Sequence, residues 1–236
     1  MSSIISIRKE INMNFLDNLY FIGDGSAFSK GKMTSFYYIY NDIIYFFECN
    51  TDTFSYIKTH NLSKYKKWVI CISHTHEDHC GMLGNTLYYL KYIYKLSLEN
   101  ITIIAPTVIK QYLSIVAPDL NIPIYYNYDN IDTFTTTHAI GIQSIGFKFF
   151  INNKCIFAYT GDCNTLPTNI VHDFNNNIIE YLITECTLIN NSTVHLPINK
   201  ILNDINESRL NNLKLVHFDS NKDKSYILNV IDILKN

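Results

Sequence analysis

Three histidines and two carboxylates crowd into the segment HTHEDH at residues 74–79, directly after an apolar run. His74 and His76 are two residues apart, so an extended backbone would turn both imidazoles to the same side, where they could share one ion. Asp78 and His79 follow, and could face a second ion. Imidazole and carboxylate are the usual donors of catalytic zinc sites. The spacing H-x-H-x-D-H therefore predicts a metal centre at the end of a strand.

Further residues that could complete such a centre also come at the ends of apolar or β-prone runs. His138 ends TFTTTH, Asp162 follows KCIFAYT in the sequence TGD, and His217 ends LKLVH. Any one of them alone is more typical of an ordinary buried side chain that is hydrogen-bonded. Together with the first segment they supply enough donors for two ions that share a carboxylate. We expect seven metal ligands: His74, His76, Asp78, His79, His138, Asp162 and His217.

The elements that must position these residues can be read from the apolar pattern. Runs rich in β-branched and aromatic residues predict strands at 19–23, 35–40, 42–48, 67–73, 101–106, 123–128, 145–151, 154–160, 180–184 and 213–218. Helices are favoured at 82–97, 107–115, 197–208 and 223–234. Because strands and helices are interspersed, we expect two sheets with helices outside. We expect one domain, residues 1–236, with residues 1–13 as a loose extension.

The order of these motifs resembles that of the metallo-β-lactamase superfamily, from about residue 18 to residue 217. The resemblance implies a four-layer αββα sandwich of the α+β (α/β) class, with a dinuclear site at one edge. It implies a first ion held by His74, His76 and His138. A second ion would be held by Asp78, His79 and His217. Asp162 would bridge the two ions. The dinuclear site implies two metal ions per chain. His76 stands where the flavodiiron branch has glutamate, which favours Zn²⁺ over iron, although Mn²⁺ and Fe²⁺ suit the same donors.

Two further segments narrow the resemblance to ribonuclease Z-like and cyclic nucleotide phosphodiesterases. IGDGSAF (22–28), followed by TSFYYIY, is similar to the opening loop and second strand of that branch. TECT (184–187) and NSTVHL (191–196) are similar to its glutamate motif and downstream histidine.

The resemblance to this branch also implies roles for three residues. His195 would act as the general acid, Glu185 would orient it, and Asp78 would hold or accept the proton of the nucleophile. The alternative for His195 is a packing residue at the start of a helix, because Pro197 follows closely.

The sequence also departs from ribonuclease Z. Only one hairpin separates His138 from Asp162, so the tRNA-gripping arm of the short bacterial form is missing. The chain has 19 Lys+Arg and 21 Asp+Glu, whereas binding to extended nucleic acid usually needs a basic excess. We therefore expect neither tRNA processing nor an extended nucleic acid partner. The usual Asp-Cys-Gly is replaced by Glu48-Cys49-Asn50, where Glu48 is long enough to reach a ligand.

These features predict a zinc-dependent phosphodiesterase whose substrate is a small molecule, either a cyclic nucleotide or a cyclic ribose phosphate. A hydroxide that bridges the metals would attack the phosphorus of this substrate. His195 would protonate the leaving ribose alkoxide. One alternative is another hydrolase of this fold, for a lactone, lactam or thioester. A second is a non-catalytic, metal-stabilised binding protein, although a structural zinc site would be closed.

The compartment and partners are predicted from simpler features. Six cysteines lack CxxC spacing, which favours free thiols in a reducing, cytoplasmic environment. Arg8, Lys9 and Glu10 interrupt the region where a secretory signal would be apolar. The apolar runs are too short to span a bilayer, so we expect no membrane partner. Resemblance to ribonuclease Z relatives implies a homodimer.

Overall fold

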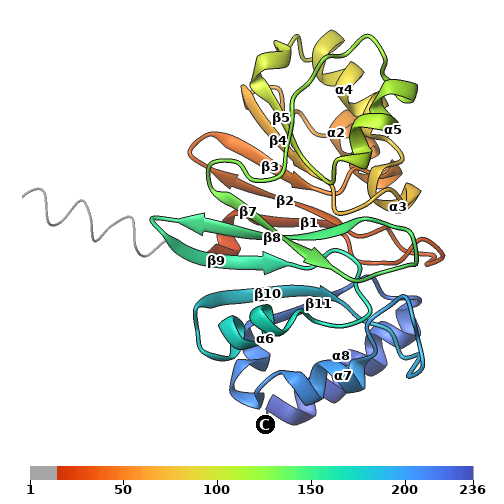
Figure 1. The fold of residues 1–236 in the computed structure, drawn as a ribbon, viewed down its shortest axis with the longest axis vertical. Helices are drawn as coiled ribbons and strands as arrows, with labels where there is room; N and C mark the ends of the chain where they lie inside the picture. Colours follow the sequence, from red (N-terminus) through yellow and green to blue (C-terminus); the bar gives the residue numbers. More distant parts are fainter. Residues whose placement is uncertain (1–14, 236) are drawn as a thin grey trace, which may run out of the picture.

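The computed structural model describes residues 15–235. Two mixed β-sheets lie face to face, and helices cover the outer side of each (Figure 1). The predicted αββα sandwich is therefore confirmed. The predicted extension, residues 1–13, lies outside the described residues.

The first sheet is formed by the N-terminal half of the described chain. Its strands, in spatial order, are β1 (Leu19–Gly23), β2 (Ser35–Tyr40), β3 (Ile43–Phe47), β4 (Lys67–Cys71), β5 (Ile101–Ile104) and β6 (Ile124–Tyr125). An antiparallel meander, β1–β2–β3, continues into parallel strands from β3 to β6. Its outer helices are α2 (Thr51–Thr59), α3 (Glu77–Cys80), α4 (Leu83–Tyr92) and α5 (Val108–Val116).

The second sheet repeats this plan in the C-terminal half. Its strands, in spatial order, are β11 (Leu213–Val216), β10 (Ile179–Glu185), β9 (Lys154–Tyr159), β8 (Ser144–Ile151) and β7 (Ile131–Thr136). Strands β7, β8 and β9 are antiparallel, and β9, β10 and β11 are parallel. Its helices are α6 (Thr168–Asn175), α7 (Ile198–Asp204) and α8 (Asn221–Lys235). Short 3₁₀ helices are η1 (Phe15–Asn18), η2 (Leu98–Asn100) and η3 (Glu207–Asn212).

Some elements differ from the sequence prediction. Neither α2 nor α6 is among the predicted helices, and β7 is not among the predicted strands. The sequence of α2, TDTFSYIKT, is rich in threonine and aromatic residues, which have modest helix propensity. Its start depends on Asn50, whose side chain accepts hydrogen bonds from the backbone N–H groups of Asp52 and Thr53. Such a cap is specific to one position and stabilises a helix that propensity alone does not favour.

A layer of aromatic side chains fills the space between the two sheets. Phe36 and Phe47 stack at a centroid distance of 4.6 Å in the first sheet. Tyr159 of the second sheet meets Phe36 edge-on at 5.1 Å, and Phe157 meets Phe47 at 5.4 Å. Most of the chain's aromatic residues thus serve the core, and the offset and edge-on contacts fix the spacing of the sheets. All six cysteines are free and buried.

Phe47→Ala tests this layer. Phe47 is fully buried, so loss of its ring should lower the free energy of unfolding by about 3–5 kcal/mol, measured by urea denaturation. Phe28→Ala is the matched control, because Phe28 is 96% exposed, and it should change stability by no more than about 0.5 kcal/mol. Equal losses in the two variants would contradict this account of the core.

Candidate metal centre

The predicted ligands gather where strands of both sheets end. His74 and His76 follow β4, and Asp78 and His79 lie on the short helix α3. His138 follows β7, while Asp162 and His217 follow β9 and β11. Because these ends lie at the same edge of the sandwich, the seven side chains converge although they are far apart in the sequence. The structure therefore brings together every residue of the predicted ligand set.

Three histidines and one carboxylate form the first donor group. His76 Nδ1 lies 2.9 Å from His74 Nε2 and 3.2 Å from His138 Nε2. Asp162 Oδ2 lies 4.0 Å from His74 Nε2 and 3.8 Å from His138 Nε2. Tetrahedral zinc with Zn–N bonds of about 2.0–2.1 Å separates its nitrogen donors by roughly 3.3 Å. The spacing of the histidine nitrogens fits a divalent ion.

The second donor group contains Asp78, His79 and His217. Asp78 Oδ2 lies 3.4 Å from His79 Nε2 and 3.3 Å from His217 Nε2. Asp162 Oδ2 is 3.3 Å from His79 Nε2 and 3.4 Å from His217 Nε2. The same oxygen of Asp162 thus faces both donor groups, which is the position of a bridging ligand.

Two buried atoms in this cluster lack hydrogen-bond partners within the described chain. They are His79 Nε2 and Asp162 Oδ1. A buried polar atom without a partner costs about 1–3 kcal/mol, and a cation held between the two donor groups would remove that cost for a ligand atom such as His79 Nε2. The residues present therefore fit a metal centre in spacing, donor chemistry and unmet bonding capacity.

The outer nitrogens of the histidines are held by neighbouring groups. His138 Nδ1 donates a hydrogen bond of 2.7 Å to the carbonyl oxygen of Val194. Ser73 Oγ lies 2.9 Å from His74 Nδ1. Contacts of this kind fix the ring orientation and leave the opposite nitrogen directed at the ion. Sequence reasoning missed the Val194 contact, because a backbone carbonyl leaves no signal in residue types.

Glu48 takes the place of the aspartate that is usual in the resembling family. Its Oε1 lies 3.3 Å from His79 Nδ1, and its Oε2 accepts a hydrogen bond from the backbone N–H of Ser73. The longer side chain therefore reaches the ligand, as its length suggested. Asn50, which replaces the usual glycine, donates from Nδ2 to the carbonyl oxygen of Asp78.

His195 and Glu185 form a pair beside the two donor groups. His195 Nδ1 lies 2.8 Å from Glu185 Oε2. The His195 ring is 5.3 Å from that of His138 and 5.1 Å from that of His217, measured between centroids. It therefore lies between one ligand of the first group and one of the second. Its side chain is 30% exposed, so it faces the open side of the centre.

The charges of this pair follow from their surroundings. Burial lowers the pKa of His195, but the hydrogen bond and the charge of Glu185 outweigh this effect and raise the pKa to about 9. Burial and the nearby charge of Asp162 raise the pKa of Glu185, which His195 partly opposes. His195 precedes α7, and its side chain is hydrogen-bonded to Glu185.

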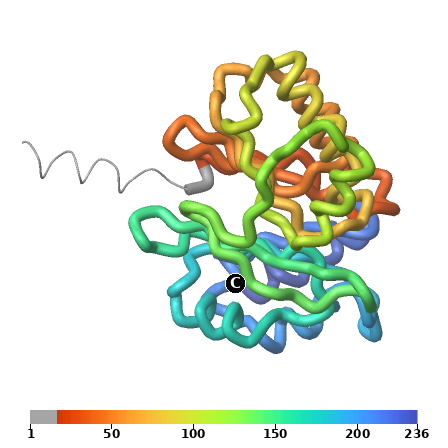
Figure 2. Tube along the Cα trace, turned by 45° about the horizontal axis from the view of Figure 1, so that its top comes forward, coloured from red at the N-terminus to blue at the C-terminus, as the bar shows by residue number. Residues whose placement is uncertain are grey.

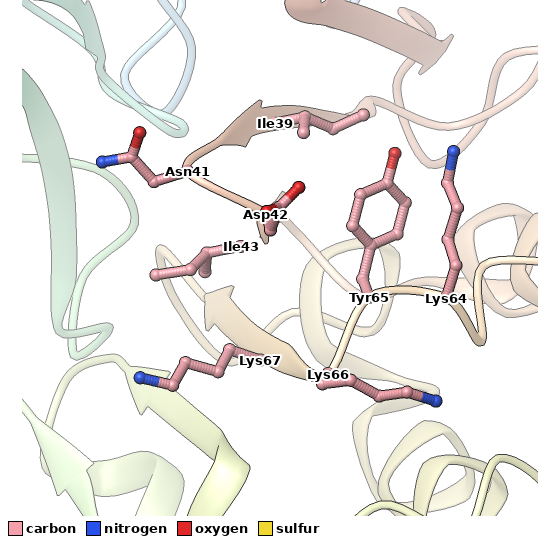
Figure 3. A pocket seen from close by; sticks show the side chains of 8 residues that line it. All are labelled: Ile39, Asn41, Asp42, Ile43, Lys64, Tyr65, Lys66 and Lys67. Atoms are coloured by element: carbon pink, nitrogen blue, oxygen red, sulfur yellow. The ribbon is translucent and has the colours of Figure 1, made fainter.

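A separate cavity of about 630 Å³ lies at the other end of β4 (Figure 3). Lys64, Tyr65, Lys66 and Lys67 line one side of it. These residues precede or begin β4, whereas the ligands follow its carboxyl end. Lys66 and Lys67 point in opposite directions, so they do not converge on one anion (Figure 3). This cavity is not part of the metal centre.

Comparison with known families gives a match over most of the described chain. Residues 17–114 and 106–230 match the family model described as anti-Pycsar protein Apyc1. The chain belongs to the Apyc1 family. No curated protein sequence matches this Apyc1-family chain. Within its described residues, no helix is long and apolar enough to cross a membrane.

The fold of this Apyc1-family protein is also found in solved structures. They include the metallo-β-lactamase fold protein YhfI from Bacillus subtilis, with a TM-score of 0.66, 14% identity, and 91% of this chain and 90% of that chain covered. Human tRNase Z, short form (ELAC1), has a TM-score of 0.64 and 17% identity, covering 87% and 93%. A diphosphatase from the PhnP family has a TM-score of 0.65 and 13% identity, covering 86% and 87%. The predicted metallo-β-lactamase fold is confirmed.

Glu48→Gln tests the outer contact to His79. Loss of the negative charge beside Nδ1 should reduce metal affinity about 10- to 100-fold, the usual range for such contacts. Affinity is measured by competition with a chromogenic chelator. Glu77→Gln is the control, because Glu77 lies exposed on α3, and it should retain full affinity. Unchanged affinity in Glu48→Gln would show that the contact does not support the ligand.

Proposed function

We propose that this protein is a zinc-dependent phosphodiesterase that hydrolyses a small phosphodiester, a cyclic nucleotide or a cyclic ribose phosphate. The observation that carries the proposal is the position of His195, held by Glu185 between the two donor groups. A proton donor in that place serves a reaction with a poor leaving group. A ribose alkoxide is such a group, whereas a lactam or thioester has less need of an acid.

The donor groups define what the bound ions would contribute. Two zinc ions held by the seven ligands would supply a nucleophilic water at neutral pH and take up charge on the phosphoryl oxygens. Burial raises the pKa of Asp78, but the hydrogen bond to His217 and the nearby imidazole of His79 outweigh it and hold the pKa well below its usual range. Asp78 is therefore ionised and can accept a hydrogen bond from the nucleophile, which orients it for attack.

His195 acts on the other side of the reaction. With a pKa of about 9 it is protonated at neutral pH. Glu185 occupies Nδ1, so Nε2 is the nitrogen left to donate a proton to the leaving oxygen. Glu185 is buried and also accepts a hydrogen bond from the backbone N–H of Cys163. These contacts support the proposed role of Glu185 in orienting the imidazole.

Several features support a small substrate. One hairpin, β8–β9, occupies the chain between His138 and Asp162, where short-form ribonuclease Z carries its arm. Arg209 is not available for phosphate, because its guanidinium donates to the carbonyl oxygens of Phe174, Ile179 and Glu180. The match to the anti-Pycsar protein Apyc1 family supports this substrate class. Homodimer formation and a cytoplasmic location stay predictions.

A substrate panel tests the proposed class. The zinc-loaded protein should hydrolyse 2′,3′- or 3′,5′-cyclic nucleotides and bis-p-nitrophenyl phosphate, and a chelator should abolish both activities. Nitrocefin, a thioester and a pre-tRNA should react slowly or not at all. Asp162→Ala is the inactive control, because it removes the carboxylate shared by both donor groups. Faster turnover of nitrocefin or the thioester, or specific cleavage of the pre-tRNA, would overturn the proposal.

His195→Ala tests the acid. Turnover of a cyclic nucleotide should fall about 10²- to 10⁴-fold, the usual range for general acid catalysis, with metal content unchanged. The loss should shrink for a p-nitrophenolate leaving group, which departs without a proton. Glu185→Gln should give a milder form of the same pattern. His172→Ala, at an exposed histidine, is the matched control.

The same variant predicts a difference in pH dependence. The protonated form of His195 is present below pH 9 and is lost above it, since its pKa is about 9. The rate with a ribose leaving group should therefore fall as the pH rises through that value, and His195→Ala should lack this limb. Equal losses for both leaving groups, or loss of metal, would sink the acid assignment.

A further inference from the structure

The loop of residues 24–34 presents Phe28 to solvent at its tip. The Phe28 side chain is 96% exposed. It lies in a tight turn closed by a hydrogen bond of 3.1 Å from the N–H of Ser29 to the carbonyl oxygen of Ser26. Gly25 permits the turn, because a Cβ at that position would lie 2.8 Å from Ser29 Cβ. The aromatic ring is therefore held out by a packed loop.

This loop is bonded to the segment that contains the ligand His217. The N–H of Ser26 donates to the carbonyl oxygen of Phe218, and the N–H of Phe218 donates to that of Asp24. The N–H of His217 donates to Thr34 Oγ1 at 3.0 Å. Figures 1 and 2 show the loop, in red, at the edge of the sandwich where the strands that precede the ligands end. The position of Phe28 is thus fixed relative to the metal centre.

A cavity of about 400 Å³ lies between this loop and the start of α8. It is lined by Phe28, Lys30, Asp219, Ser220, Asn221 and Lys222. Asp219 is two residues beyond His217, and its Oδ2 accepts a hydrogen bond of 2.8 Å from Thr187 Oγ1. Thr187 begins the loop that leads to His195. The cavity is therefore lined in part by the segment that follows the ligand His217, and Asp219 connects that segment to Thr187.

The lining combines one aromatic ring with a carboxylate, a hydroxyl, an amide and two ammonium groups. A flat ring suits stacking on a nucleobase, and the polar groups suit the hydrogen-bonding edge of the base. The lysines add positive charge that favours an anionic ligand. We propose that this cavity binds the nucleobase of the substrate, with Phe28 stacked on the base. The inference rests on the proposed function and makes Phe28 a specificity-determining residue for cyclic nucleotides.

Direct binding can be measured with Phe28→Trp. The chain has one tryptophan, Trp68, which is fully buried and stacked on Phe46, so the introduced indole would give a separate exposed signal. Uridine and adenosine 5′-monophosphates should quench this signal with saturation, whereas ribose 5-phosphate should not. Equal quenching by ribose 5-phosphate, or none by either nucleotide, would overturn the proposal.

Kinetics of Phe28→Ala give the second test. The KM for the cyclic nucleotide should rise roughly 5- to 100-fold, as expected for loss of one base–aromatic stack, with kcat nearly unchanged. A cyclic ribose phosphate that lacks a base should be hydrolysed as by the wild type. Ile140→Ala is the control, because Ile140 is a fully exposed apolar residue on another loop, and its KM should not change.

The outcomes separate this inference from the proposed function. Normal wild-type hydrolysis with an unchanged KM in Phe28→Ala overturns the base site alone. No hydrolysis of any cyclic nucleotide, cyclic ribose phosphate or bis-p-nitrophenyl phosphate by the wild type overturns the proposed function, and this inference with it. A change of molar mass in Phe28→Ala, measured by light scattering, with an unchanged KM would place the ring in a subunit contact and overturn the base site.

Discussion

The buried carboxylate of Asp162 is the group on which the rest of the site depends. A buried charge is costly unless it is paired, and Oδ2 of Asp162 lies within 4.0 Å of nitrogens from both donor groups. Burial raises the pKa of Asp162, but His217 and His79 outweigh it and keep the carboxylate ionised. The end of β9 can reach this position because Gly161 has a φ of +60° and a Cβ there would lie 2.5 Å from Ser73 Cβ. One glycine thus lets the two sheets meet at the centre.

The aromatic layer between the two sheets sets the spacing between them, and so the distance between the strand ends that carry the ligands. Phe36 and Phe47 from one sheet interlock with Phe157 and Tyr159 from the other. At the site end of the layer, the N–H of Ile145 donates to the carbonyl oxygen of Ser73, which links the two sheets through the backbone. The ligands therefore follow strands whose two sheets are held together by this packing.

Most of the metal ligands and strands could be predicted from the sequence, because side-chain types alone indicate them. Ligands at strand ends were recognisable because their donor chemistry is unusual there, and β1 to β5 because their apolar residues are continuous. The prediction failed at β7, an edge strand in which three of the six residues are threonine and only Ile131 and Thr136 are buried, so the strand lacks an apolar signal. It failed at α2, which begins at a local cap on Asn50. The support of His138 by the Val194 carbonyl depends on tertiary folding and could not be predicted from residue types.

The six buried thiols bear on which ions the centre can select. Cys80 and Cys163 are chain neighbours of the ligands His79 and Asp162, yet burial raises the pKa of Cys80 to about 12 and that of Cys163 well above its usual value. Thiols that stay protonated are poor ligands, since metals bind the thiolate. The donor groups found among the described residues contain no cysteine, so a soft ion such as Cu(I), which prefers sulfur, meets only nitrogen and oxygen donors there. The cysteine thiols, which are the softest donors of the chain, are buried and lie outside the centre's donor groups. The ion is therefore selected by nitrogen and oxygen ligands.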